Sequence, residues 1–125
     1  MPVSTSTDES HALTIFTVEG ELTFEEQMNA LKAFYSGDPT ANVLWDFRLM
    51  KGNRVSSQEL EELFNFIKAN RAKRLQGKTA LVATSDLDFG LSRVSEAYSQ
   101  IRQLPWEMKA FRTMDEALEW IDRDN

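Results

Sequence analysis

The side chains best suited to chemistry in this 125-residue chain follow two apolar segments, at the points where predicted strands end. They are polar, charged or glycine: Asp46, Arg48, Ser56, Ser57, Ser85, Asp86, Gly90 and Arg93. In open α/β sheets, ligands bind at the carboxyl ends of the strands. Helix N-termini at such a rim offer free amides and a positive dipole, so a serine there can carry or meet a phosphate. We therefore expect these eight residues to form a ligand- or partner-binding site, and Ser56 is also expected to cap a helix.

These side chains do not make a catalytic set. The sequence has no cysteine, and its only histidine, His11, has no ligand-type neighbour with which to build a triad or a transition-metal site. Adjacent acidic pairs such as Glu61-Glu62 diverge around a predicted helix. No base is placed near Ser56 or Ser57 by the sequence, so a serine hydrolase is the least favoured class. We expect a protein that binds rather than catalyses, with no metal or cofactor.

Composition narrows the classes of partner. Fourteen basic residues against 20 acidic ones give a net charge of −6, which disfavours general binding of nucleic acid. No apolar run approaches the ~20 residues that span a bilayer, so no transmembrane segment is expected. Residues 1–10 lack the pattern of a signal peptide and are expected to form a frayed polar arm. The absence of cysteine fits a reducing compartment, and we expect a cytoplasmic protein.

One segment is strongly basic although the chain as a whole is acidic. Residues 68–78 carry no acid and several cations, namely Lys68, Arg71, Lys73, Arg74 and Lys78. They could form an anion-binding patch for phosphate or acidic lipid headgroups. They could equally be the C-terminus of a helix, where cations offset the helix dipole. We favour the helix explanation.

The apolar pattern predicts the elements that hold these residues. Runs rich in apolar and β-branched residues predict strands at 12–18, 42–47, 79–84 and 106–111. Three intervening helices are expected to begin with capping boxes at Thr23, Ser56 and Thr113, each followed three residues later by glutamate. The order β-α-β-α-β-α-β-α predicts an α/β fold with a mainly parallel sheet of four or five strands and helices packed against it. Residues 11–125 are expected to form one domain.

Two expectations concern large apolar side chains. A helix over residues 89–103 is expected to bury a stripe consisting of Leu91, Val94, Tyr98 and Ile101. Trp106 and Trp120 lie off the main stripes. They could be half exposed at a contact site, but covering an edge of the sheet is the plainer explanation. If they or Phe66 are exposed, a homodimer is expected, because large surface aromatics often mark contact sites.

The order and spacing of several short segments resemble the STAS domain of anti-sigma-factor antagonists. The segments are Val18-Glu19-Gly20-Glu21-Leu22-Thr23, residues 42–47 followed by Ser56-Ser57, residues 77–84, and residues 111–121. A closer likeness is to bacterial STAS-like proteins that are also grouped with Sec14-type lipid-binding domains. It rests on Trp45-Asp46-Phe47, on Phe89-Gly90-Leu91-Ser92-Arg93, and on Phe111-Arg112 leading to Ala117-Leu118-Glu119-Trp120. The resemblance covers the chain from about His11 onward and implies a STAS-like fold with no assigned reaction.

In the antagonists, the second serine of the pair is phosphorylated by a partner kinase, and Ser57 matches that position. In that family the pair is flanked by aspartate and glycine, whereas Val55 and Gln58 stand there in this chain. These departures disfavour a kinase-driven switch. The first hypothesis is therefore a non-catalytic binding or regulatory module for a small or lipid-like ligand at the strand rim. The alternative is a partner-switching protein regulated at Ser57.

Overall fold

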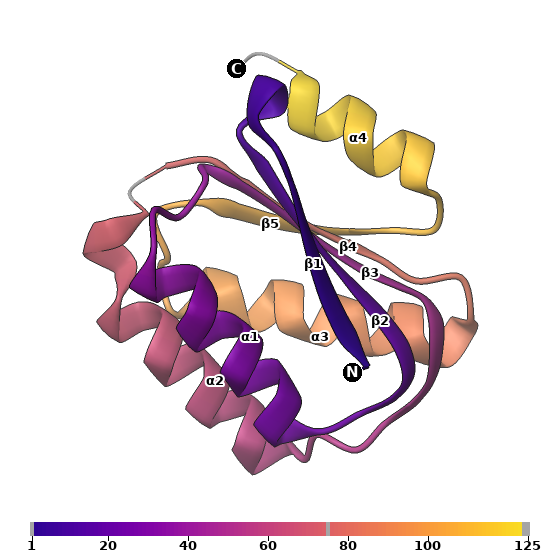
Figure 1. Ribbon diagram of the computed structural model, residues 1–125. Coiled ribbons are helices and arrows are strands. Elements are labelled where there is room, and N and C mark those ends of the chain that lie inside the picture. The colour runs from indigo at the N-terminus through magenta and orange to yellow at the C-terminus, as the bar shows by residue number, and fades with distance from the viewer. Residues whose placement is uncertain (1, 75, 124–125) are drawn as a thin grey trace.

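The computed structural model describes residues 2–74 and 76–123, which form a five-stranded sheet with helices on both faces (Figure 1). The strands are β1 (Val3–Asp8), β2 (Leu13–Leu22), β3 (Asn42–Asn53), β4 (Lys78–Val82) and β5 (Glu107–Phe111). The helices are α1 (Phe24–Ser36), α2 (Ser57–Ala69), α3 (Asp86–Ile101) and α4 (Met114–Asp122), with short 3-10 turns η1 (Glu9–His11) and η2 (Arg71–Lys73). The strands lie in the order β1-β2-β3-β4-β5, and β2 to β5 are parallel. The predicted α/β class and mainly parallel sheet are confirmed.

The first residues form a strand rather than the frayed arm expected from the sequence. Val3 to Asp8 pair antiparallel with β2, from Val3 opposite Val18 to Asp8 opposite Leu13. The strand is the outer edge of the sheet, and all of it except Val3 is exposed. Serine and threonine suit such a solvated edge, although they give no apolar signal in the sequence. The element order therefore gains one antiparallel strand before the predicted series.

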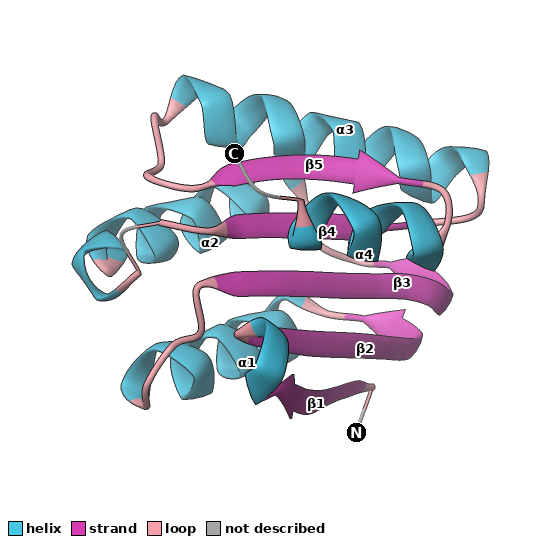
Figure 2. Ribbon diagram, turned by 90° about the horizontal axis from the view of Figure 1, so that it is seen from above, coloured by secondary structure: helices cyan, strands magenta, loops and turns pink. Residues whose placement is uncertain are grey.

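The sheet separates two apolar layers. Alternate residues of β3 point to opposite faces, so Val43, Trp45 and Phe47 join the core beneath α1, α2 and α3. Leu44 joins the smaller core beneath α4. Figure 2 shows α4 alone over one face of the sheet, with α1, α2 and α3 on the other. Every residue of β4 is buried, as expected for a central strand covered on both faces.

The helices begin at the predicted cap residues, but the full capping box forms at only one of the three. At Thr23 and Thr113 the hydroxyl donates to the glutamate carboxylate three residues on, at 2.9 Å in both cases. The side chains of Thr23, Ser56 and Thr113 each accept a hydrogen bond from the amide three residues on. The reciprocal capping box is present at Ser56, where the Ser56 amide donates to Glu59 Oε1 at 3.0 Å and the Glu59 amide donates to Ser56 Oγ at 3.1 Å. This cap fixes where α2 begins, and therefore where Ser57 lies.

The predicted buried stripe of the third helix is wrong. Leu91 is 41% exposed and Ile101 75% exposed, while Ser92 and Ser99 are buried instead. Helix α3 packs against β5 at the edge of the sheet, and short serine side chains allow a close approach there. Its apolar stripe faces partly towards α2 and partly towards solvent.

The structure distinguishes between the alternatives for the tryptophans and for the basic segment. Trp106 and Trp120 are buried rather than half exposed. Arg74 and Lys78 are buried, whereas Lys68, Arg71 and Lys73 are exposed, so only part of the basic segment is open to solvent. Lys78 Nζ donates to the carbonyls of Trp120 and Arg123, both at 2.6 Å, and thus serves the C-terminus of α4 rather than that of α2. Among the described residues, no helix has the length and apolar character needed to cross a membrane.

Candidate functional site

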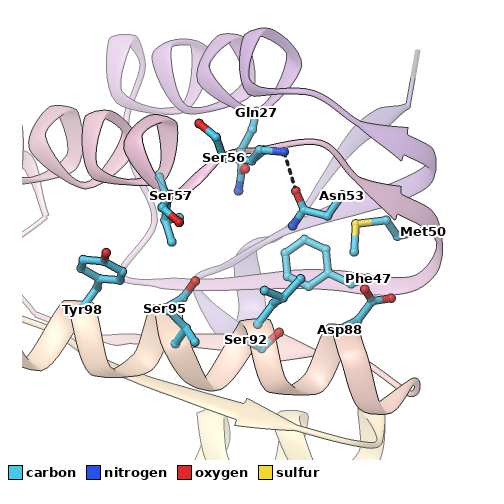
Figure 3. Close-up of a pocket in the computed structure, with 14 residues that line it drawn as sticks. Gln27, Phe47, Met50, Asn53, Ser56, Ser57, Asp88, Ser92, Ser95 and Tyr98 are labelled. Carbon is cyan, nitrogen blue, oxygen red and sulfur yellow. Dashed lines mark hydrogen bonds between the residues drawn. The ribbon is translucent and has the colours of Figure 1, made fainter.

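A pocket of about 130 Å³ opens between the start of α2 and the adjoining face of α3, beside the carboxyl end of β3 (Figure 3). Its apolar lining comes from Phe47, Met50, Val55, Leu60, Leu91 and Val94. Its polar lining comes from Gln27, Asn53, Ser56, Ser57, Asp88, Ser92, Ser95 and Tyr98. The pocket lies at the rim where the sequence predicted a site, and it combines an apolar floor with several hydroxyl groups.

The polar side chains are positioned by local hydrogen bonds and packing. Asn53 Oδ1 accepts a hydrogen bond from the Val55 amide at 2.9 Å, which shapes the turn from β3 into α2 (Figure 3). Ser57, the first residue of α2, lies across the pocket from Ser95 and Tyr98 of α3. The Tyr98 ring is stacked on Phe64 at 5.7 Å between centroids. Rigid elements therefore present hydroxyls on both sides of the opening.

Two smaller pockets continue the first one inward, between the sheet and the helices. A middle pocket of about 60 Å³ shares Gln27, Phe47, Leu60 and Ser95 with the outer one. An inner pocket of about 30 Å³ shares Leu31, Trp45, Ile67 and Met108 with the middle one. The three form a row from the serine-lined opening to the amino-terminal end of β4.

The inner end of the row is polar. Its lining includes Tyr35, Arg74, Thr79 and Trp106, all of them buried. Arg74 donates from Nε to the Ala41 carbonyl and from Nη2 to the Lys78 carbonyl, both at 2.9 Å. Its guanidinium carbon lies 4.4 Å from the centre of the Trp106 ring.

Burial changes the acid–base properties of two of these groups. It lowers the pKa of Arg74 to about 10, with the Tyr35 hydroxyl opposing the shift, so the guanidinium stays charged at neutral pH. Burial also raises the pKa of Tyr35, against the effect of the nearby Arg74 charge, and keeps that hydroxyl protonated. Thr79 Oγ1 and Trp106 Nε1 have no hydrogen-bond partner among the described residues.

The predicted site residues are only partly brought together. Ser56 and Ser57 line the outer pocket. Asp46 and Arg48 lie on the face of the sheet that carries α4, where Arg48 Nε and Nη2 donate to the two Asp46 carboxylate oxygens at 2.9 and 3.0 Å. The hydrogen bond to Asp46 raises the pKa of Arg48.

The four predicted residues of α3 and its cap lie near the pocket without lining it. Ser85 caps α3 through the Asp88 amide. Asp86 Oδ1 accepts a hydrogen bond from Arg112 Nη1 at 2.8 Å. Arg93 Nε is 3.7 Å from Glu96 Oε2, and Gly90 is exposed. Ser85, Asp86 and Arg93 are thus engaged with neighbouring residues, and none of the four lines the pocket.

Sequence reasoning missed most of the residues that line the pocket. Ser92, Ser95 and Tyr98 recur at intervals of three along α3 and so share one face of that helix. Ser92 follows the third strand closely enough to be placed at the rim from the sequence, whereas Ser95 and Tyr98 were missed. That recurrence of hydroxyl side chains was the available signal. The apolar floor could not be separated from ordinary core residues by pattern alone.

The surroundings of the two serines bear on whether they could act as nucleophiles. Within residues 2–74 and 76–123, the Ser57 hydroxyl has no hydrogen bond to an acidic or histidine side chain, and the Ser56 oxygen accepts only the Glu59 amide. The same residues contain no group of three or more histidine, aspartate or glutamate side chains placed to hold a metal ion.

The comparisons with known proteins bear on the fold. The sequence matches no protein-family profile and no curated protein. Among solved structures, a DUF3478-family protein from Shewanella loihica PV-4, described as having a SpoIIAA-like fold, is similar with a TM-score of 0.60 and 18% identity. That alignment covers 95% of this chain and 91% of the other.

The anti-sigma factor antagonist SpoIIAA, in its unphosphorylated form, is similar with a TM-score of 0.52 and 14% identity. The alignment covers 95% of this chain and 96% of SpoIIAA. The chain therefore has the SpoIIAA-like, STAS-like fold that the sequence resemblance implied.

Proposed function

We propose that this STAS-like protein is a non-catalytic, cytoplasmic binding module that takes a small, largely apolar ligand in the pocket between α2 and α3. The supporting observation is the pocket itself, whose apolar floor is ringed by hydroxyl and amide side chains. Apolar contact supplies most of the affinity in such sites, and a few polar groups fix the orientation of the ligand. In the part of the chain that the structure describes, neither serine is hydrogen-bonded to a basic group that could activate it, which supports binding rather than turnover.

The volume of the outer pocket limits the size of a ligand that can bind without rearrangement of the protein. An apolar cavity of about 150 Å³ accommodates benzene, and the outer pocket measures about 130 Å³. One ring or a short branched chain is therefore the natural occupant of this section. A longer ligand must extend into the middle pocket, past Phe47 and Leu60.

An NMR titration with indole, a ring-sized apolar probe, tests the proposal. We expect saturable shift changes centred on Ser57, Leu60 and Tyr98. Ser95→Trp should abolish them, because the new ring fills the pocket. Ser36→Trp, at an exposed position at the end of α1, is the matched control and should bind normally. The proposal fails if indole gives no saturable change or if Ser95→Trp binds as well as the parent. If indole binds as expected, native mass spectrometry of protein purified from its own host should identify the natural ligand.

A second candidate is protein-partner switching through Ser57. Ser57 is exposed at the first position of α2, where a phosphate of about −1.5 to −2 charges would meet the helix dipole favourably. Leu91 and Val94 on α3 are partly exposed beside the same pocket and offer apolar surface to a protein. The similar SpoIIAA is an anti-sigma factor antagonist.

Co-purification from the native host tests this candidate. We expect a bound partner to be lost with Ser57→Asp and kept with Ser57→Ala, while Ser36→Asp serves as the charge control. Equal partner recovery with both Ser57 variants would remove the candidate. Size-exclusion chromatography of the same samples reports whether the partner is a second copy. Trp106 and Trp120 are buried and unavailable to such a homodimer, whereas Leu87, Leu91, Val94 and Ile101 of α3 are exposed.

A further inference from the structure

The inner end of the row of pockets contains buried polar groups that would have no partner on an entirely apolar ligand. Thr79 Oγ1 and Trp106 Nε1 are buried, and neither has a hydrogen-bond partner among the described residues. Thr79 is opposite Val43 in the sheet, so its side chain lies on the face covered by α1, α2 and α3. Buried polar groups are almost always hydrogen-bonded, and each exception needs an explanation.

A buried cation stands beside these two groups. Arg74 is 5% exposed, and no carboxylate in the described part of the chain forms an ion pair with it. Two carbonyl oxygens and the face of the Trp106 ring partly stabilise the positive charge of Arg74. An unpaired buried charge is costly, and a negative group brought next to it would be held strongly.

We propose that the inner pocket binds the carboxylate end of an amphiphilic ligand, with Arg74, Thr79 and Trp106 as its donors and the apolar body in the middle and outer pockets. This inference rests on the proposed ligand-binding function and names the class of ligand as a monocarboxylic acid. The ligand enters with its carboxylate leading and leaves its apolar end near Ser57 and Tyr98.

The dimensions fit this orientation. A space of about 30 Å³ holds one or two small polar groups, enough for a carboxylate but not for a ring. The middle pocket is lined mainly by apolar side chains and suits a short alkyl chain. Met108, which borders both pockets, is flexible and can open the passage between them.

Calorimetric titration with octanoate and with octan-1-ol at neutral pH tests the inference. The two probes share an apolar chain and differ in the charged end. We expect octanoate to bind at least tenfold more tightly than octan-1-ol. Thr79→Val, which replaces the hydroxyl by a methyl group, should weaken octanoate about tenfold and leave octan-1-ol unchanged. Trp106→Phe should act in the same direction, because it removes the indole N–H and keeps an aromatic ring.

The control is Thr17→Val, a half-buried threonine on the opposite face of the sheet, which should bind both probes normally. Equal affinity of the parent for the two probes, or octanoate binding unaffected by both Thr79→Val and Trp106→Phe, overturns the inference while the pocket remains a ligand site. Failure of both probes and of indole to bind overturns the proposed function itself.

Discussion

Lys78 should be among the most important polar residues for stability, although it lies away from the pocket. Its ammonium group donates to the carbonyls of Trp120 and Arg123, both at 2.6 Å, and lies 5.3 Å from the centre of the Trp120 ring. These carbonyls belong to the last turn of α4, where backbone acceptors have no partner within the helix. A cation there also meets the negative end of the helix dipole.

Lys78→Met keeps the length and apolar stem of the side chain and removes the charge. Two carbonyls then lose a charge-assisted hydrogen bond, each of which is worth about 1.5–3 kcal/mol. The Trp120 carbonyl keeps a weaker donor, the Arg123 amide at 3.3 Å. Relief from burying the ammonium group offsets part of this loss. We expect the free energy of unfolding to fall by about 2–4 kcal/mol. The midpoint of urea unfolding should therefore drop by roughly 1–2 M.

Urea unfolding followed by far-UV circular dichroism measures this change. Lys32→Met, at an exposed position on α1, is the matched control and should change stability by less than about 0.5 kcal/mol. An unchanged or higher midpoint for Lys78→Met would show that desolvation of the ammonium group outweighs its hydrogen bonds, and it would refute this reasoning.

Two further predictions concern the backbone and pH. Gly77 has φ +117°, and a Cβ there would lie 1.8 Å from the Ala41 carbonyl oxygen. Gly77→Ala should cost about 3 kcal/mol or more in urea unfolding, whereas Gly52→Ala, which meets only ordinary contacts, should change stability by less than about 1 kcal/mol. The hydrogen bond from His11 to Asp8 at 2.8 Å raises the pKa of the histidine. Its contribution to stability is therefore complete below the unfolded pKa near 6.5 and is lost as pH rises through the folded value. Urea midpoints between pH 5.5 and 8.5 should fall slightly with rising pH in the parent protein, and a slope that persists in His11→Asn would exclude this histidine as the cause.

Local signals in the sequence predicted the framework well. The strand at 42–47 alternates side chains between two apolar layers, and the caps at Thr23, Ser56 and Thr113 fix where three helices begin. Strand β1 was not predicted from the sequence because its serines and threonines form no apolar pattern. Its pairing with β2 is a tertiary contact that local propensity does not encode.

The sequence predicted a site at the rim where the outer pocket lies, but only Ser56 and Ser57 of the predicted residues line that pocket. The position of a residue at the end of a strand does not say on which face its side chain lies. Val43, Trp45 and Phe47 face α1, α2 and α3, so the alternation of the strand places Asp46 and Arg48 on the other side. The hydroxyl side chains that recur every three residues mark one face of α3, but the sequence does not specify that this face borders a pocket next to α2.

The stability of the ligand-free protein offers a test of the inner pocket that needs no ligand. Thr79 and Thr14 are both buried threonines on the face of the sheet that α1, α2 and α3 cover. The Thr14 hydroxyl lies 2.8 Å from that of Thr40, whereas Thr79 Oγ1 has no partner among the described residues. Thr→Val should therefore have opposite effects at the two positions.

We expect Thr14→Val to lower the free energy of unfolding by about 1 kcal/mol, the value of a typical hydrogen bond, and Thr79→Val to raise it by a similar amount. Urea unfolding of both variants beside the parent measures the difference. If Thr79→Val is destabilising like Thr14→Val, the hydroxyl is already satisfied, for example by a buried water molecule. The Thr79 hydroxyl would then no longer support the proposal that the inner pocket binds the polar end of a ligand. If Thr79→Val is stabilising, a polar group has been kept at this position at a cost to the fold, as expected where binding requires it.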